Sequence, residues 1–174
     1  MAPQDVMHVI LEGGLGHEIR LFLRYCILQA QFFTVDQLNV AIANFPYGYA
    51  ERSNKPSRIT LDELLQENTC LGGQKASQMW LLARVLLLLI DQAVPANDFH
   101  RRVYQLHVEI LYRTMAPEVH PNTAQSLTNV IEVHHILFRL AYPQVNITPK
   151  LHYYVHIPTV LLRDGPARWV CCLR

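Results

Sequence analysis

Apolar side chains recur with helical spacing in the first part of the chain. In residues 17–31 they return every three or four positions, which places them on one face of an α-helix. These side chains are Ile19, Phe22, Leu23, Cys26, Ile27 and Ala30. The intervening residues Glu18, Arg20, Arg24 and Gln29 are expected on the opposite, polar face. The pattern therefore predicts an amphipathic helix.

The segment before this helix has a less regular pattern. Residues 5–12, with the sequence DVMHVILE, suit either a short strand or a helical turn. Gly13, Gly14 and Gly16 follow, and the backbone is unusually free at glycine because it lacks a Cβ atom. We expect these glycines to form a hinge between the first segment and the helix.

Two capping signals mark the next helices. Thr34 is followed three positions later by Gln37, and Thr60 by Glu63, which is the pattern of a capping box at a helix N-terminus. The predicted helices cover residues 34–44 and 60–71, with a loop rich in proline and charge at residues 45–58. Both helices are expected to be short.

The rest of the chain predicts longer helices and no sheet. Helices are expected in residues 74–91, 98–115 and 122–142, followed by one that opens at Thr148-Pro149, kinks at Pro158 and stops at Gly165-Pro166. The first of these is apolar nearly all round, which predicts a central, buried element. The aromatic residues Trp80, Tyr104, Tyr112 and Phe138 are expected in the core. The fold class is mainly α: one domain over residues 1–174, an irregular bundle of six or seven helices, with room for one short strand at each end.

Composition and charge restrict the classes of function. The chain is 51% apolar and 17% charged, with a formal net charge of +1. A general nucleic-acid binder usually carries a basic stripe, and none is visible here. The arginines Arg20, Arg24, Arg101 and Arg102 are expected on solvated helix faces. The apolar stretch at residues 79–90 contains Arg84 and is too short to span a membrane.

The cysteines and the sequence motifs exclude several further classes. Cys26, Cys70, Cys171 and Cys172 include no C-x-x-C pair, so zinc ribbons and thioredoxin-like redox sites are not supported. With no secretory signal visible, reduced thiols in an intracellular protein are the expectation. The chain also lacks a P-loop, a dinucleotide-binding glycine motif and a nucleophile elbow.

Two constellations offer metal or acid–base chemistry. Asp5 and His8 are three positions apart, which places a carboxylate and an imidazole on one side of a turn. His152 and His156 have the i, i+4 spacing that can hold zinc on one helix face, and His134 and His135 extend this set. The glutamate of an H-E-x-x-H metalloprotease is missing. The plainer interpretation is a surface pair for the first, and histidines hydrogen-bonded within helix contacts for the second.

Several short motifs, in order, resemble one family. They are Asp5-x-Met7-His8 with Leu11-Glu12-Gly13, Phe45-x-Tyr47-Gly48, Asn54-Lys55-Pro56, Ser77-Gln78-Met79-Trp80, Ala116-Pro117-Glu118, and Pro149-Lys150-Leu151-His152-Tyr153 through His156-x-Pro158 to Gly165-Pro166. Together they resemble the CACTA (En/Spm-like) cut-and-paste DNA transposases of animal genomes. The resemblance spans nearly the whole chain.

The resemblance implies a scaffold around a catalytic site. In that family an RNase H-like core holds two divalent metals, such as Mg²⁺, through three acidic residues. A D-x-x-H motif, matched by Asp5 and His8, follows the second acid, and a helical insertion follows the motif. Residues 1–15 would then be the core edge, 16–148 the insertion and 149–174 the return segment. The last catalytic glutamate is expected after Gly165-Pro166, but no acid follows Asp164.

These observations predict a transposase-derived fragment that is not an enzyme and needs no cofactor of its own. Apolar helix faces that once packed on the RNase H-like sheet would be exposed, which predicts self-association or a protein partner. The alternative is a small helical metal-binding or adaptor module that uses His134, His135, His152 and His156. Weak DNA binding is a third hypothesis. A nuclear location follows from the resemblance alone.

Overall fold

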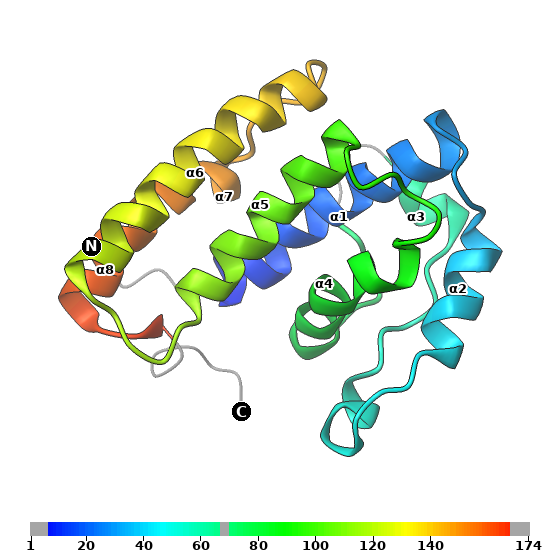
Figure 1. The fold of residues 1–174 in the computed structure, drawn as a ribbon, viewed down its shortest axis with the longest axis horizontal. Helices are drawn as coiled ribbons and strands as arrows, with labels where there is room; N and C mark the ends of the chain where they lie inside the picture. The colour runs from blue at the N-terminus through cyan, green and yellow to red at the C-terminus, as the bar shows by residue number, and fades with distance from the viewer. Residues whose placement is uncertain (1–6, 67–69, 168–174) are drawn as a thin grey trace.

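Every element in the described part of the chain is helical. The computed structural model describes residues 7–66 and 70–167, which form eight α-helices and four 3₁₀ or π segments. The predicted class, a mainly α irregular bundle, is confirmed (Figure 1). No strand forms within residues 7–66 and 70–167, so the short strand expected at each end is not found there.

The first helical rod is continuous where a hinge was expected. A π-helical segment η1 (Met7–Gly14) runs directly into α1 (Leu15–Arg24) and then into a second π segment, η2 (Tyr25–Gln29). Gly14 has right-handed helical dihedral angles, with φ −61° and ψ −41°. The hinge prediction was wrong because glycine serves close packing here: a Cβ at Gly14 would collide with the Tyr154 hydroxyl.

The helix α1 is the centre of the bundle. It contacts α3, α4 and α5, and Leu15–Leu23 are all buried. Figure 1 shows α1 behind α5 and beside α3. The polar face predicted for this helix is therefore wrong at Glu18 and Arg20, which are buried, and correct only at Gln29, which is exposed. Neighbouring helices cover this helix on the side that the sequence pattern assigns to solvent.

Two of the arginines expected in solvent instead bind the ends of helices. Arg20 donates to the carbonyl oxygens of Leu64, at 3.4 Å, and Gln66, at 2.6 Å, where α3 (Leu61–Leu65) ends. Arg101 donates to the Val94 carbonyl at 2.7 Å and to Asp91 at 2.5 Å, just beyond α4 (Ala76–Ile90). Carbonyls at a helix C-terminus lack partners within the helix, and a cation suits them. By contrast, Arg102 is exposed and Arg24 is half-buried.

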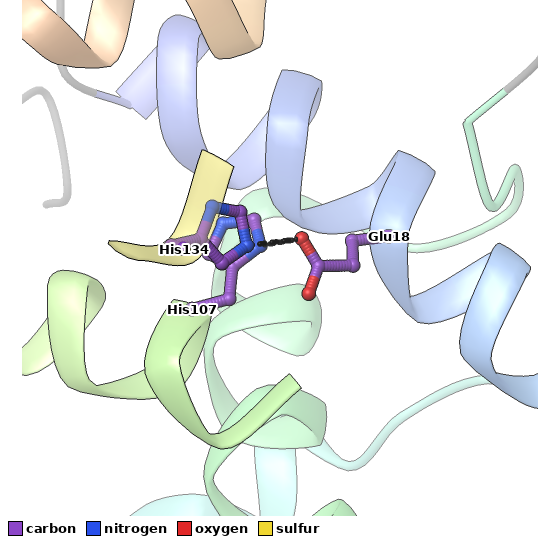
Figure 2. Close-up of side chains that lie close together, drawn as sticks. All are labelled: Glu18, His107 and His134. Atoms are coloured by element: carbon purple, nitrogen blue, oxygen red, sulfur yellow. Dashed lines mark hydrogen bonds and ion pairs between the residues drawn. The ribbon is translucent and has the colours of Figure 1, made fainter. Parts of the chain in front are cut away.

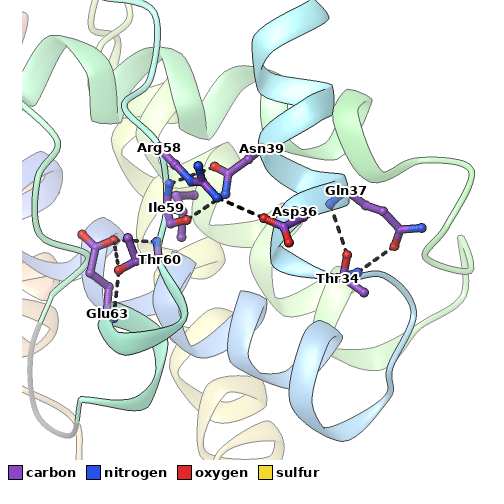
Figure 3. Close-up of polar contacts among 8 residues, drawn as sticks. All are labelled: Thr34, Asp36, Gln37, Asn39, Arg58, Ile59, Thr60 and Glu63. Atoms are coloured by element: carbon purple, nitrogen blue, oxygen red, sulfur yellow. Dashed lines mark hydrogen bonds and ion pairs between the residues drawn. The ribbon is translucent and has the colours of Figure 1, made fainter.

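Both predicted capping boxes are confirmed, and each begins a short helix. Thr34 caps α2 (Val35–Asn44) together with Gln37, and Thr60 caps α3 together with Glu63. A 3₁₀ turn, η3 (Tyr49–Asn54), lies in the predicted loop. As Figure 3 shows, the Asn39 amide bonds both the N–H and the carbonyl of Ile59, while Arg58 pairs with Asp36 at 3.1 Å. These contacts fasten α2 to the segment that precedes α3.

The long helices form the core with α1. The helix α5 (Phe99–Thr114) packs along α6 (Pro121–Ala141) more extensively than any other pair of elements. The helix α4 buries seven side chains, but Leu88 is 66% exposed, so α1 rather than α4 is the central element. Of the predicted core aromatics, Tyr104 and Phe138 are buried, Trp80 is half-buried and Tyr112 is 49% exposed.

The C-terminal helix is interrupted as its prolines predict. Thr148 caps α7 (Pro149–His152), a 3₁₀ turn η4 (Tyr153–His156) follows, and α8 (Ile157–Asp164) ends at Gly165, whose φ is +84°. The break precedes Pro158 because proline has no N–H for the preceding turn and its ring crowds the carbonyl four residues earlier. Among the described residues, no helix is both long enough and apolar enough to cross a membrane.

Candidate functional site

Three polar side chains from three different helices meet in the core. Glu18 comes from α1, His107 from α5 and His134 from α6, and all three side chains are fully buried. Oε2 of Glu18 lies 2.6 Å from Nδ1 of His107 and 2.8 Å from Nε2 of His134 (Figure 2). The carboxylate therefore joins helices that are 89 and 116 positions away along the sequence.

Each of these residues occupies a core position of its helix. His107 lies on the same face as Val103, Tyr104, Ile110 and Leu111, which are fully buried. His134 continues the buried stripe of Leu127, Ile131 and Phe138. Glu18 lies three positions after Leu15 and four before Phe22. The helical repeat that buries its apolar neighbours therefore buries the polar residue as well.

The hydrogen bonds fix the protonation pattern of the cluster. An ionised carboxylate only accepts, so His107 Nδ1–H and His134 Nε2–H both donate to Glu18. His107 Nε2 then accepts a 2.8 Å hydrogen bond from the hydroxyl of Tyr154, which lies in η4 and is also buried. The four side chains form one chain of donors and acceptors: Tyr154 to His107, and both histidines to Glu18.

The electrostatics favour a buried anion. Burial raises the pKa of Glu18, but the opposing effect of His134 and His107 is larger and brings it to about 2. Burial lowers the pKa of His107, and the attraction of Glu18 offsets this only in part. At neutral pH Glu18 is therefore ionised while His107 is neutral. A buried carboxylate that keeps its charge needs hydrogen-bond donors or a cation beside it, and both histidines donate to this one.

The cluster also has unused capacity for ligands. Glu18 Oε1 and His134 Nδ1 are buried, and neither has a hydrogen-bond partner among the described residues. Within residues 7–66 and 70–167, Glu18, His107 and His134 are the only three His, Cys, Asp or Glu side chains with ligand atoms all within 4.8 Å of one another. Two imidazoles and a carboxylate are ligands that Zn²⁺ and other divalent transition metals accept.

The predicted site residues lie elsewhere. Asp5 is outside the described residues, and His8 is exposed on η1, where its Nδ1 lies 2.5 Å from Glu12 of the next turn. His152 and His156 are exposed, with ring centroids 6.0 Å apart and the rings nearly perpendicular. Zinc binding by this exposed pair stays a prediction.

The predicted four-histidine set does not gather into one site within the described residues. Of its members only His134 belongs to the buried cluster. His135 is partly buried beside Tyr154, at 6.3 Å between ring centroids. Burial, together with His134 and His107, lowers the pKa of His135 to about 4. Glu18 and His107 were not predicted as site residues, and the sequence pattern assigned Glu18 to the polar face of its helix.

Comparison with protein-family models, curated proteins and solved structures finds no match to this chain. The resemblance to CACTA transposases, and the RNase H-like origin that it implies, therefore stay predictions made from the sequence motifs.

Proposed function

We propose that this chain is a transposase-derived helical module that acts by binding rather than by cutting DNA, and that its partner is a second copy of itself. The outer face of α6 carries the proposal. Val133, Ile136 and Leu140 are 45%, 61% and 65% exposed on this helix. Large apolar side chains gathered on one exposed face are typical of an interaction surface.

The position of these residues on α6 defines one continuous stripe. Val133, Ile136 and Leu140 are spaced i, i+3 and i+7, so they share a face. The core residues Ile131 and Phe138 face the opposite way, into the bundle. In Figure 1 this helix forms one edge of the described structure. The stripe therefore points away from the bundle and can meet another helix.

Charge complementarity favours a second copy as the occupant. Glu132 and Arg139 are both exposed, lie one heptad apart on the same flank of the stripe, and make no ion pair within the described part of the chain. In an interface with two-fold symmetry the same patch of both copies is in contact. If one residue of the first copy contacts a second residue of the other copy, the reverse contact also forms. Two antiparallel copies of α6 centred near Ile136 would pair each Glu132 with the Arg139 of the other copy, at both ends.

Self-association can be tested with the full chain by light scattering after size-exclusion chromatography. The unmodified protein is expected as a dimer and Ile136→Lys as a monomer. Leu88→Lys is the matched control, because Leu88 on α4 is equally exposed but lies off the stripe. A wild-type monomer that binds no hydrophobic dye would contradict the proposal. A heterologous complex without self-association would instead identify a different protein as the occupant.

The further parts of this proposal rest on the resemblance alone. We expect no cleavage of plasmid DNA with Mg²⁺ or Mn²⁺, and turnover by the purified chain would overturn this expectation. DNA contact and a nuclear location are family properties that carry over only by analogy. A gel shift at low salt tests the first, since phosphate contacts dominate affinity under those conditions.

A further inference from the structure

We infer that Glu18, His107 and His134 form a structural site for one divalent transition-metal ion, with Zn²⁺ the best match. The inference concerns the core of the bundle and does not depend on the proposed dimer. It replaces the histidines His152 and His156 as the first candidate for metal binding with a buried set drawn from α1, α5 and α6.

The donor atoms suit this ion. Zn²⁺ binds imidazole nitrogen and carboxylate oxygen at about 2.0–2.2 Å and prefers four donors in a tetrahedron. His107 Nδ1 and His134 Nε2 supply two nitrogens, and both oxygens of Glu18 are available because Oε1 has no partner among the described residues. Because the two oxygens of one carboxylate are too close together to fill two corners of a tetrahedron, Glu18 would fill one corner or bind through both oxygens in a distorted shell.

The distances need only a small adjustment. Donors bound to one tetrahedral zinc are roughly 3.4 Å apart, as follows from bond lengths near 2.1 Å. The carboxylate oxygen now lies 2.6 Å and 2.8 Å from the two nitrogens, with a proton in each gap. Replacing two protons by one ion would move the donors apart by roughly 0.6–0.8 Å. Rotation of the glutamate side chain can supply this movement.

The charge of Glu18 and the hydrogen bond between His107 and Tyr154 also suit a divalent cation. The cluster holds a fully buried carboxylate between two imidazoles, and a divalent cation would balance the charge of this carboxylate. When Nδ1 of His107 binds the ion, the ring proton resides on Nε2 and donates to the Tyr154 hydroxyl, 2.8 Å away. Metal-bound histidines usually make such a second hydrogen bond, which orients the ring.

The burial of the site indicates a structural role. All three ligand side chains are fully buried, so the ion would be enclosed during folding rather than exchanged at a surface. Structural zinc sites are closed, whereas catalytic ones keep a position open to solvent. The ion would clamp α1, α5 and α6 together at the centre of the fold, and its binding would stabilise the folded chain.

The first test measures metal in the purified full chain. We expect one zinc per chain by elemental analysis, loss of thermal stability on dialysis against a chelator, and recovery with Zn²⁺. The melting temperature should rise by about 10 °C when free Zn²⁺ exceeds Kd about a thousandfold. Co²⁺ should give the visible absorption bands of tetrahedral coordination by nitrogen and oxygen, without a thiolate charge-transfer band.

Variants then assign the site. Glu18→Gln and His134→Gln should abolish metal binding, while the surface double variant His152→Ala/His156→Ala should keep it. Loss of metal in the surface variant would overturn the assignment. If Glu18→Gln and His134→Gln fail to fold, the metal content and the thermal stability of the wild-type chain still test the inference. A wild-type chain that folds cooperatively, retains no zinc and shows no shift with Zn²⁺ or Co²⁺ would contradict the inference.

Discussion

Oε2 of Glu18 accepts a 2.6 Å hydrogen bond from Nδ1 of His107, a residue 89 positions further along the chain. Both side chains are fully buried, and the contact ties the central helix α1 to α5. His134 adds α6 through a second bond to the same oxygen. One buried carboxylate therefore joins three helices of the bundle, α1, α5 and α6.

Removing the charge of Glu18 should destabilise the fold strongly. In Glu18→Gln the amide oxygen can still accept from both histidines, but the negative charge is lost and the NH₂ group is buried at the place of Oε1, which has no partner among the described residues. Breaking a buried ionic network typically costs about 3 kcal/mol or more. Urea denaturation followed by circular dichroism measures this loss. Glu12→Gln, at an exposed position on η1, is the control and should change stability by under about 0.5 kcal/mol.

Adding one methyl group at Gly14 should disturb the hydrogen bond from Tyr154 to His107, and with it the contact of His107 with Glu18. The new Cβ would collide with the Tyr154 hydroxyl, which donates to His107. Overpacking of this kind costs about 1–3 kcal/mol, so Gly14→Ala should lower the denaturation midpoint. Gly48→Ala should not, because a Cβ at Gly48 meets only the flexible Glu51 carboxylate at 3.6 Å. Equal midpoints for the two variants would contradict the close packing of Gly14 against Tyr154.

The two capping boxes should each contribute to stability. Thr34 and Thr60 accept hydrogen bonds from backbone N–H groups at the starts of α2 and α3. Replacement of an N-cap threonine by alanine costs about 1 kcal/mol. We expect that loss for Thr34→Ala and for Thr60→Ala in chemical denaturation. Thr159→Ala, at an exposed position in the first turn of α8 that is not an N-cap, should instead change stability by under about 0.5 kcal/mol.

Acid should lower the stability of the fold through His100, which lies between α5 and the end of α6. Nε2 of His100 bonds the Ala141 carbonyl at 3.1 Å, and its ring stacks on Tyr25, with Asp98 and Tyr142 as its other neighbours. Burial lowers the pKa of His100, and the Ala141 carbonyl and Asp98 oppose this only in part. The folded pKa is below 6.5, so the unfolded chain takes up the proton first. Stability should therefore fall as pH drops below 6.5.

The variant His100→Gln tests this pH dependence. It keeps a donor for the Ala141 carbonyl but cannot titrate, so its free energy of unfolding should change less between neutral and mildly acid pH. His120→Gln serves as the control, because it makes the same substitution at an exposed histidine. Parallel profiles for wild type and His100→Gln would rule out a contribution from this histidine.

Local signals were predicted well because their causes lie within a few residues. The capping boxes at Thr34 and Thr60, the cap at Thr148, the break before Pro158 and the stop at Gly165 all depend on adjacent backbone, so the sequence alone identifies them. The class of fold followed from the same periodic patterns. The resemblance to transposases added an expected origin, which stays a prediction.

The candidate site was not predicted because its causes are tertiary. Glu18 is charged, so the sequence pattern assigns it to a polar helix face. The packing of α3, α4 and α5 around α1 buries that face. Arg20 is buried for a similar reason, since the end of α3 supplies carbonyl acceptors. The sequence did name His134 as a candidate metal ligand, but it could not show that His134 would meet Glu18 and His107.

A charge-swap cycle in sedimentation equilibrium tests the proposed association through α6 most directly. Glu132→Arg and Arg139→Glu should each weaken the dimer, because each places like charges opposite each other in the two-fold contact. The double variant Glu132→Arg/Arg139→Glu should restore dimerisation, since the opposite charges meet again with their order reversed. If the single variants dimerise as well as the wild type, or the double variant stays as weak as the single ones, the two-fold contact through α6 is wrong.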